Sequence, residues 1–161
     1  MSTHPPFIFG EFRRTLDERY RISIPTELAT PLSGSDQDCI LAKELPGCLS
    51  LWNATLWQAE LDSGVQLVES KMHAGRLSGN IEEVQRLGRL LSTRHRSVQL
   101  AARGRLLIPE GFREFLNVDP GGEVMVIGAA VCVELWRPDA WMQYLQDSMP
   151  GFRQLFDRLS G

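Results

Sequence analysis

Apolar and polar positions alternate in several short stretches of the chain, as they do in half-buried β-strands. The stretch TLDERYRISIP (15–25) ends in an Ile-Ser-Ile alternation, and QLAARGRLLIP (99–109) repeats the arrangement later in the chain. The alternation predicts two strands whose inner faces carry Ile22 and Ile24 in the first, and Leu106 and Ile108 in the second. It does not explain why arginines stand so close to buried positions in both strands.

An internal repeat with an offset of 84 residues covers much more than these two stretches. Chance does not align two tryptophan pairs at the same offset as an R-x-R-x-x-I-P motif, so the pattern indicates an ancient duplication of about 45 residues. The matched positions are Leu16/Leu100, Arg19/Arg103, Arg21/Arg105, Ile24-Pro25/Ile108-Pro109, Leu32/Leu116, Cys48/Cys132, Leu51-Trp52/Leu135-Trp136, Trp57/Trp141 and Leu61/Leu145.

Each copy has the same predicted order: strand, tight turn, strand, short helix, two strands and a closing helix. In the first copy the predicted elements are 12–16, 22–24, 25–32, 39–43, 47–52 and 54–61. In the second copy they are 96–100, 106–108, 109–117, 123–127, 131–136 and 138–145. Pro25 and Pro109 suit the first position of a helix. Gly104 supplies a positive φ in the second turn, and DPGGE (119–123) is typical of a turn.

A unit of about 45 residues buries too little surface to fold alone. Two copies in one chain can do so by pairing strands across a shared core with pseudo-twofold symmetry. Between them SGNIEEVQRLGRLL predicts a helix, with Asn80 and Glu83 in a capping-box pattern. The tail PGFRQLFDRLSG has an apolar stripe with helical spacing, which packs either on its own domain or on another subunit. Its members are Phe152, Leu155, Phe156 and Leu159.

Composition narrows the class of protein. With 43% hydrophobic and 23% charged residues, the chain is expected to be globular and cytosolic, without a membrane span or signal peptide. The three cysteines are Cys39, Cys48 and Cys132, too scattered for a zinc site or a disulfide framework, so they are expected to be reduced core thiols. No catalytic motif or metal-ligand spacing is present, so neither an enzyme nor a bound cofactor or metal is expected.

Charge is segregated along the sequence, although its formal net value is only −3. The segment 86–105 contains six arginines and no acid, whereas 106–161 contains four arginines and eight acids. The local field decides which partners bind, because salt screens charges beyond about 8–10 Å. A basic segment in a net-acidic chain therefore remains compatible with nucleic-acid binding.

The motif L-D-x-x-x-R-[IL]-x-[IL]-P is repeated some 80 residues on, and each copy is followed by a strand ending in Leu-Trp and a helix with tryptophan. With these features the chain resembles the MraZ family from about Gly10 to its end. The resemblance implies a bacterial transcriptional regulator of the division and cell-wall gene cluster, including its own promoter. It also implies two tandem swapped-hairpin AbrB-like (SpoVT-AbrB) units, an α+β, mostly β fold with a pseudo-twofold barrel-like core and flanking helices. The expected divisions are 10–54, a helical connector 55–93, 94–139 and C-terminal helices 140–161.

In that family the paired D-x-x-x-R segments are taken to contact DNA, and subunits form rings on short direct repeats in the promoter. The first motif keeps Asp17 and Arg21, but Tyr20 replaces the usual glycine, which implies strain or another turn geometry. The second keeps Gly104 and Arg105, but Ala101 replaces the acid. If the acid orients its arginine, Arg105 is held more loosely and the two halves are unequal readers.

An arginine after a hairpin turn projects from a rigid two-stranded ribbon, which fits the DNA major groove. We assign Arg21 and Arg105 to guanine, the other arginines to phosphates, and Asp17 to bracing the turn or orienting an arginine. The candidate DNA-binding residues are Arg13, Arg14, Asp17, Arg19, Arg21, Arg94, Arg96, Arg103 and Arg105.

Three alternatives remain. The arginines could merely protect a solvated edge strand, and His95 could be either a phosphate contact or a solvated surface side chain. The whole protein could instead be an antitoxin-like or scaffold interaction module without sequence-specific DNA binding. Trp52 and Trp136 are expected to serve packing, with no ligand.

Overall fold

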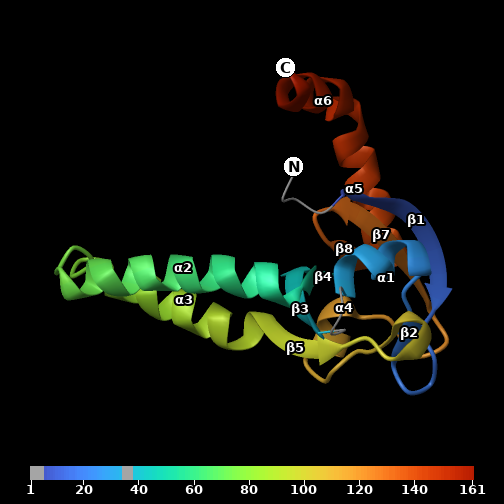
Figure 1. Ribbon diagram of the computed structural model, residues 1–161, viewed down its shortest axis with the longest axis horizontal. Coiled ribbons are helices and arrows are strands. Elements are labelled where there is room, and N and C mark those ends of the chain that lie inside the picture. The colour runs from blue at the N-terminus through green and yellow to red at the C-terminus, as the bar shows by residue number, and fades with distance from the viewer. Residues whose placement is uncertain (1–5, 34–37) are drawn as a thin grey trace.

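The computed structural model describes residues 6–33 and 38–161. Strands and helices from both halves of the sequence build one body, and two helical extensions project from it (Figure 1). The strands are β1 (Ile8–Thr15), β2 (Arg21–Ser23), β3 (Asp38–Leu45), β4 (Cys48–Asn53), β5 (His95–Gln99), β6 (Arg105–Leu107), β7 (Glu123–Ala130) and β8 (Val133–Trp136). The helices are α1 (Thr26–Ser33), α2 (Ala54–His73), α3 (Ile81–Arg94), α4 (Phe112–Leu116), α5 (Pro138–Ser148) and α6 (Phe152–Ser160), with 3-10 turns η1 (Ala102–Gly104) and η2 (Met149–Gly151).

Strand pairing joins the two halves of the sequence. Within the described residues one antiparallel sheet has the order β1-β7-β8-β4-β3-β5, and β2 pairs only with β6. Because β1 and β5 are the outer strands, these residues form an open sheet and no closed barrel. The α+β class with antiparallel strands is confirmed, but the predicted barrel-like closure is not.

The pairs follow the repeat, with one exception. Arg21 pairs with Leu107 and Ser23 with Arg105, as an offset of 84 requires. Strand β3 is the exception. Arg14 pairs with Val124, and its repeat equivalent Val98 pairs with Cys39. Cys39 therefore corresponds to Val124, at an offset of 85 instead of 84. A register irregularity between Lys43 and Leu45 restores the offset. The repeat therefore contains a compensated one-residue shift.

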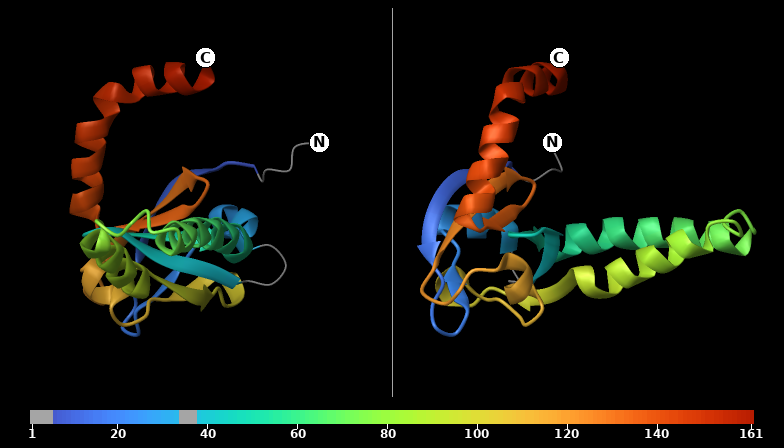
Figure 2. Two further views of the ribbon diagram at one scale, coloured as in Figure 1. Left: turned by 90° about the vertical axis from the view of Figure 1, so that its left-hand side faces the viewer. Right: turned by 180° about the vertical axis from the view of Figure 1, so that it is seen from behind.

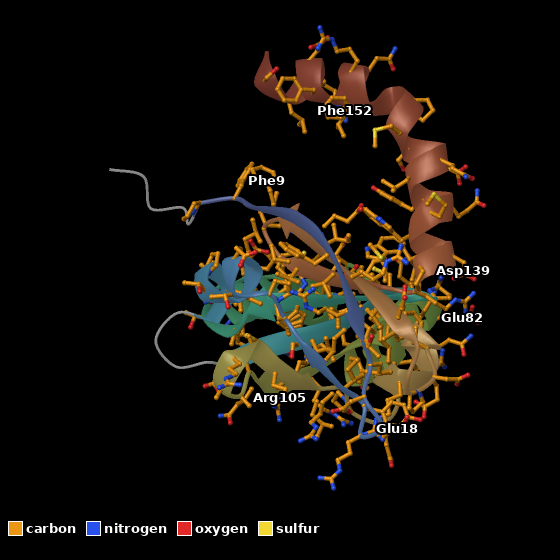
Figure 3. All side chains as sticks on the ribbon, turned by 90° about the vertical axis from the view of Figure 1, so that its right-hand side faces the viewer. Phe9, Glu18, Glu82, Arg105, Asp139 and Phe152 are labelled. Carbon is orange, nitrogen blue, oxygen red and sulfur yellow. The ribbon has the colours of Figure 1, made fainter. Side chains whose placement is uncertain are left out.

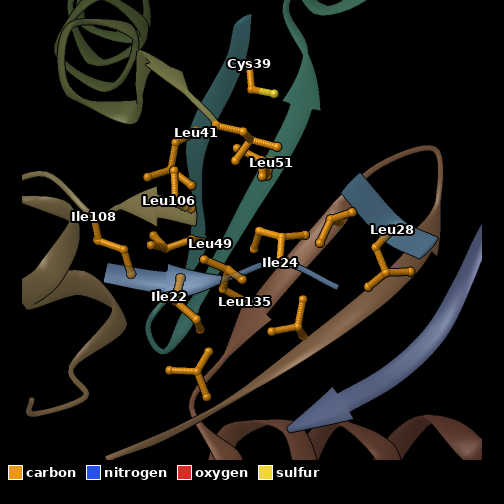
Figure 4. Close-up of a cluster of buried hydrophobic side chains, with 14 of the residues drawn as sticks. Ile22, Ile24, Leu28, Cys39, Leu41, Leu49, Leu51, Leu106, Ile108 and Leu135 are labelled. Carbon is orange, nitrogen blue, oxygen red and sulfur yellow. The ribbon is translucent and has the colours of Figure 1, made fainter. Parts of the chain in front are cut away.

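The main core lies between the large sheet and the β2–β6 ribbon. Ile22 and Leu106 face each other across the ribbon, and Ile24 and Ile108 are also buried, as the alternation predicted. Figure 4 shows these four side chains meeting leucines of β3, β4 and β8. All three cysteines are buried, which agrees with their expected role as core thiols. Burial raises the pKa of Cys132 to about 12.

Several predicted element boundaries are wrong. Helix α2 has 20 residues instead of ending near Leu61, so helix makes up a larger share of the described chain than the mostly β prediction allowed. Helix α4 begins three residues after Pro109, and α1 one residue after Pro25, so neither proline lies inside its helix. The predicted capping box at Asn80 is absent, because its side chain binds that of Glu83 instead of the helix backbone.

The two extensions are largely solvated. Helices α2 and α3 run antiparallel away from the body, and α5, η2 and α6 rise on another side of it (Figures 1 and 2). Trp57 is the one buried residue of α2, and α3 has none. The predicted stripe of α6 is exposed, with Phe152 at 53% and Phe156 at 55%, so it does not pack on its own domain. No helix within the described ranges is long and apolar enough to cross a membrane.

Candidate nucleic-acid interface

The two motif turns lie at opposite ends of the β2–β6 ribbon. The Ile108 amide donates to the Tyr20 carbonyl at 2.9 Å, and the Ile24 amide donates to the Gly104 carbonyl at 2.8 Å. These hydrogen bonds are equivalent under the repeat and fix each turn against the strand of the other half. Both turns lie on the side of the body away from α6, as the labelled Glu18 and Arg105 side chains show (Figure 3). The ribbon therefore sets the turns apart on a common side.

Asp17 braces the first turn. One carboxylate oxygen, Oδ1, accepts hydrogen bonds from the backbone amides of Arg19 and Arg21, each at 2.8 Å. The other, Oδ2, accepts a hydrogen bond from Nε of Arg21 at 3.2 Å. The Arg21 amide lowers the pKa of Asp17 most strongly, and the Arg19 amide and the Arg21 side chain add to this. Asp17 therefore both braces the turn and orients an arginine.

The second turn keeps the closing hydrogen bond of the first but not its acid, and its backbone differs at Arg103, whose φ is 64° whereas Arg19 has no positive φ. The amide of Ala101 donates to the Arg105 carbonyl at 2.8 Å, as the amide of Asp17 does to the Arg21 carbonyl at 3.0 Å. Within the described part of the chain, no side chain forms an ion pair or hydrogen bond with the Arg105 guanidinium. No carboxylate equivalent to Asp17 therefore orients Arg105 among the described residues.

Tyr20 adopts the conformation that glycine adopts in the second turn. Its φ is 59°, and that of Gly104 is 70°. This backbone region costs an L-residue roughly 1–2 kcal/mol, so the substitution produces strain at this position. The two turns also differ in geometry, because Arg103 has a φ of 64° and Arg19 has no positive φ. Arg113 covers the strained residue from the other half of the chain, with its guanidinium 4.2 Å from the Tyr20 ring and its Nε donating to the Ile108 carbonyl at 2.6 Å.

The remaining arginines differ in whether a neighbouring side chain or carbonyl already binds them. Arg13 is paired with Glu123 at 2.7 Å, and Arg94 with Glu44 at 3.2 Å. Arg14 donates to the Arg13 carbonyl, and Arg96 lies over the Phe112 ring at 5.8 Å. Arg19 and Arg103 have no ion pair within the described residues and lie exposed on the two turns. The structure therefore brings Arg19 and Arg103 to the turn tips, and places Arg13 and Arg94 beside carboxylates.

His95 is not a solvated surface residue. It is half-buried, its ring lies 4.5 Å from that of Trp57, and its Nδ1 is buried without a hydrogen-bond partner among the described residues. Desolvation and the neighbouring Arg94 lower the pKa of His95. Its ring packs against Trp57 of α2, at the base of the helical extension. Trp136 is buried, Trp52 is half-buried, and each donates to the side chain two residues before it, Glu134 and Ser50.

Sequence reasoning missed Arg113 and the acids around the first turn. Arg113 occupies the repeat position of Ala29, and Glu110 that of Thr26. A comparison of the two copies at non-matching positions would have pointed to both differences. The two turns therefore have similar backbones but different surroundings, which sequence identity between the copies cannot reveal.

Comparison with known proteins supports the resemblance seen in the motifs. A family model described as "MraZ protein, putative antitoxin-like" matches residues 93–160. A protein of Syntrophomonas wolfei named "Transcriptional regulator MraZ" is 25% identical over 150 residues, which cover 93% of this chain and 94% of the relative. One of the same name from Bifidobacterium longum is 25% identical over 163 residues, covering 98% and 95%. One from Alkaliphilus metalliredigens is 26% identical over 150 residues, covering 93% and 94%. With the duplicated motif in both halves, these matches show that the chain is similar to MraZ proteins over most of its length.

Proposed function

We propose that this protein is a transcriptional regulator that binds double-stranded DNA sequence-specifically through its two motif turns. The observation that carries the proposal is the pair of equivalent turns on one side of the body, each with an exposed arginine at its tip. Such tips supply forked donors for phosphate and guanine. The name "Transcriptional regulator MraZ" of the relatives supports the same role.

The architecture that we propose is a pair of swapped-hairpin AbrB-like units, at 10–54 and 94–139, with connector 55–93 and C-terminal helices 140–161. Pairing of β1 with β7, β3 with β5, and β2 with β6 supports this division, since each unit completes the sheet of the other. The duplication then takes the place of a homodimer. It also fixes the distance between the two turns without any association step.

Within this proposal Arg21 and Arg105 read guanine, and Arg13, Arg14, Arg19, Arg94, Arg96 and Arg103 contact phosphates. The contact of Arg21 with Asp17 uses only Nε. Both terminal nitrogens of Arg21 remain available for the forked contact with guanine O6 and N7. Arg13 and Arg94 must exchange a carboxylate for a phosphate, so their contribution is smaller than that of an unpaired arginine.

The target that we propose is the promoter of the division and cell-wall gene cluster, including the protein's own gene, in the cytoplasm and on the nucleoid. A ring-like homo-oligomer would place several pairs of turns on short direct repeats. The exposed stripe of α6 supports self-association, because an amphipathic helix of this length gains its stability from packing. Avidity over several repeats compensates for weak binding by one pair of turns.

A gel-shift titration with the duplex upstream of the gene tests this function. We expect retention of the upstream duplex in excess over an unrelated duplex of equal length, with affinity falling steeply as salt rises. If neither duplex is retained at low salt, the function is that of an interaction module. Equal retention of both would leave DNA binding but remove specificity.

The assignment of Arg105 predicts a separable effect in the same titration. Arg105→Gln is expected to remove about 1–3 kcal/mol of discrimination between the upstream and unrelated duplexes. Arg96→Gln, the matched control from the neighbouring strand β5, is expected to weaken both duplexes alike. Equal, sequence-blind losses from the two variants would remove the reading role of Arg105.

A further inference from the structure

A cavity of about 200 Å³, partly open to solvent, lies beside the second turn. Thr26 and Thr30 of α1 line one wall, and Ala101, Arg103 and Gly104 line the other. No acid is among its lining residues. The Arg103 guanidinium and the two threonine hydroxyls have no hydrogen-bond or ion-pair partner among the described residues. The cavity thus offers one cation and two hydroxyl groups to a small anion.

The first turn has larger residues at two of the positions that line this cavity. The position of Gly104 is occupied there by Tyr20, and the position of Ala29 by Arg113, whose guanidinium stacks on the Tyr20 ring at 4.2 Å. The two large side chains fill the space that small residues leave open at the second turn. The first turn is therefore closed by packing between the two halves of the chain.

The first turn is also the more acidic of the two turns. Under the repeat, Glu110 and Glu114 correspond to Thr26 and Thr30, and Asp17 corresponds to Ala101. The Glu114 carboxylate accepts the Gly111 amide at 2.6 Å. Glu18 also lies near the first turn, against Gly121. A phosphate at the first turn thus meets the carboxylates of Asp17 and Glu18, which belong to the turn itself, whereas one at the second turn meets Arg103 and hydroxyl groups.

We infer that the cavity beside the second turn binds a backbone phosphate of the DNA and makes this turn the dominant electrostatic contact of the two. The inference rests on the proposed function and adds to it a phosphate site formed by Arg103, Thr26 and Thr30. The missing acid at Ala101 is part of this site, because a carboxylate there would repel the phosphate. The second turn anchors the duplex by charge, and the first turn contributes mainly through the oriented Arg21.

Matched variants of the two turns test the inference, with affinity for the upstream duplex measured by fluorescence anisotropy over a range of salt. Arg103→Gln is expected to weaken binding about tenfold and to reduce the log–log salt slope by about one. Arg19→Gln, at the equivalent position of the first turn, is expected to cost less than Arg103→Gln, about threefold, because the neighbouring Asp17 carboxylate weakens the phosphate contact of Arg19. Equal losses from the two variants would overturn the inference.

A second experiment exchanges the equivalent residues Thr26 and Glu110 in one protein, Thr26→Glu with Glu110→Thr, so that net charge is unchanged. Thr26→Glu places an acid in the first turn of α1, which helices tolerate well, and thermal unfolding checks that folding is retained. We expect about a tenfold loss of affinity, the size expected for losing one phosphate contact. Unchanged affinity in the exchange variant would overturn the phosphate site while the proposed function stands. Wild-type protein that binds no duplex would overturn both.

Discussion

Replacing both Phe152 and Phe156 by serine is expected to lower affinity for a duplex with several repeats by about 10²–10⁴. Both rings are more than half exposed on α6, and they contact each other with centroids 5.8 Å apart. Helix α6, with the labelled Phe152, lies on the side of the body away from Glu18 and Arg105, so it does not contact the same DNA directly (Figure 3). The proposed role of the two rings is association with a second copy of the chain, which links several pairs of turns.

The control for this variant is Gln154→Ser on the same helix, which leaves the apolar stripe intact. Light scattering is expected to give a smaller particle for the double variant and an unchanged one for the control. Affinity for a duplex with a single repeat should be nearly equal in all three proteins. A wild-type particle mass in the double variant would contradict the role of α6 in assembly.

Gly104→Ala is expected to destabilise the fold by about 2–5 kcal/mol. The left-handed backbone at φ 70° accounts for roughly 1–2 kcal/mol of this in an L-residue. A Cβ atom would also lie 2.5 Å from the Ile24 carbonyl oxygen, and such overpacking costs typically about 1–3 kcal/mol. That carbonyl belongs to the residue that holds the second turn against the opposite half, so relief of the clash disturbs the ribbon itself.

Gly88→Ala in α3 is a control with the opposite sign. A Cβ atom there would meet nothing within 4 Å, and alanine favours the helix by about 0.8–1 kcal/mol over glycine. Urea denaturation should therefore show lower stability for the Gly104 variant and slightly higher stability for the Gly88 variant. A Gly104 variant as stable as wild type would mean that the turn can adopt another conformation.

Local patterns predicted most of the fold, because alternation and turn residues depend on neighbours in the sequence. The buried faces of β2 and β6 follow directly from Ile22, Ile24, Leu106 and Ile108. The length of α2 was not predictable in this way, since no apolar stripe marks its solvated outer part. The shifted register of β3 also escaped notice, because no matched side chain of the repeat lies in that strand.

The sequence predicted the positions of the two motif turns but not the side chains that surround them. The motif correctly indicated that Asp17 braces a turn and that Arg105 lacks such a brace. The stacking of Arg113 on Tyr20 joins residues of different halves, and only the folded chain places them together. The contact of His95 with Trp57 was missed for the same reason. The polar residues next to His95 in the sequence suggested a solvated side chain.

Hydrogen–deuterium exchange of the full-length protein with and without the upstream duplex tests most directly whether the turns contact DNA. It reads out each segment in the intact assembly, whatever the number of subunits. Bound duplex is expected to slow exchange in peptides that contain residues 16–22 and 100–106, with the larger effect at the second turn. The outer part of the α2–α3 extension, away from Arg94, should be unaffected. Slowed exchange in that extension, with both turns unchanged, would contradict the account.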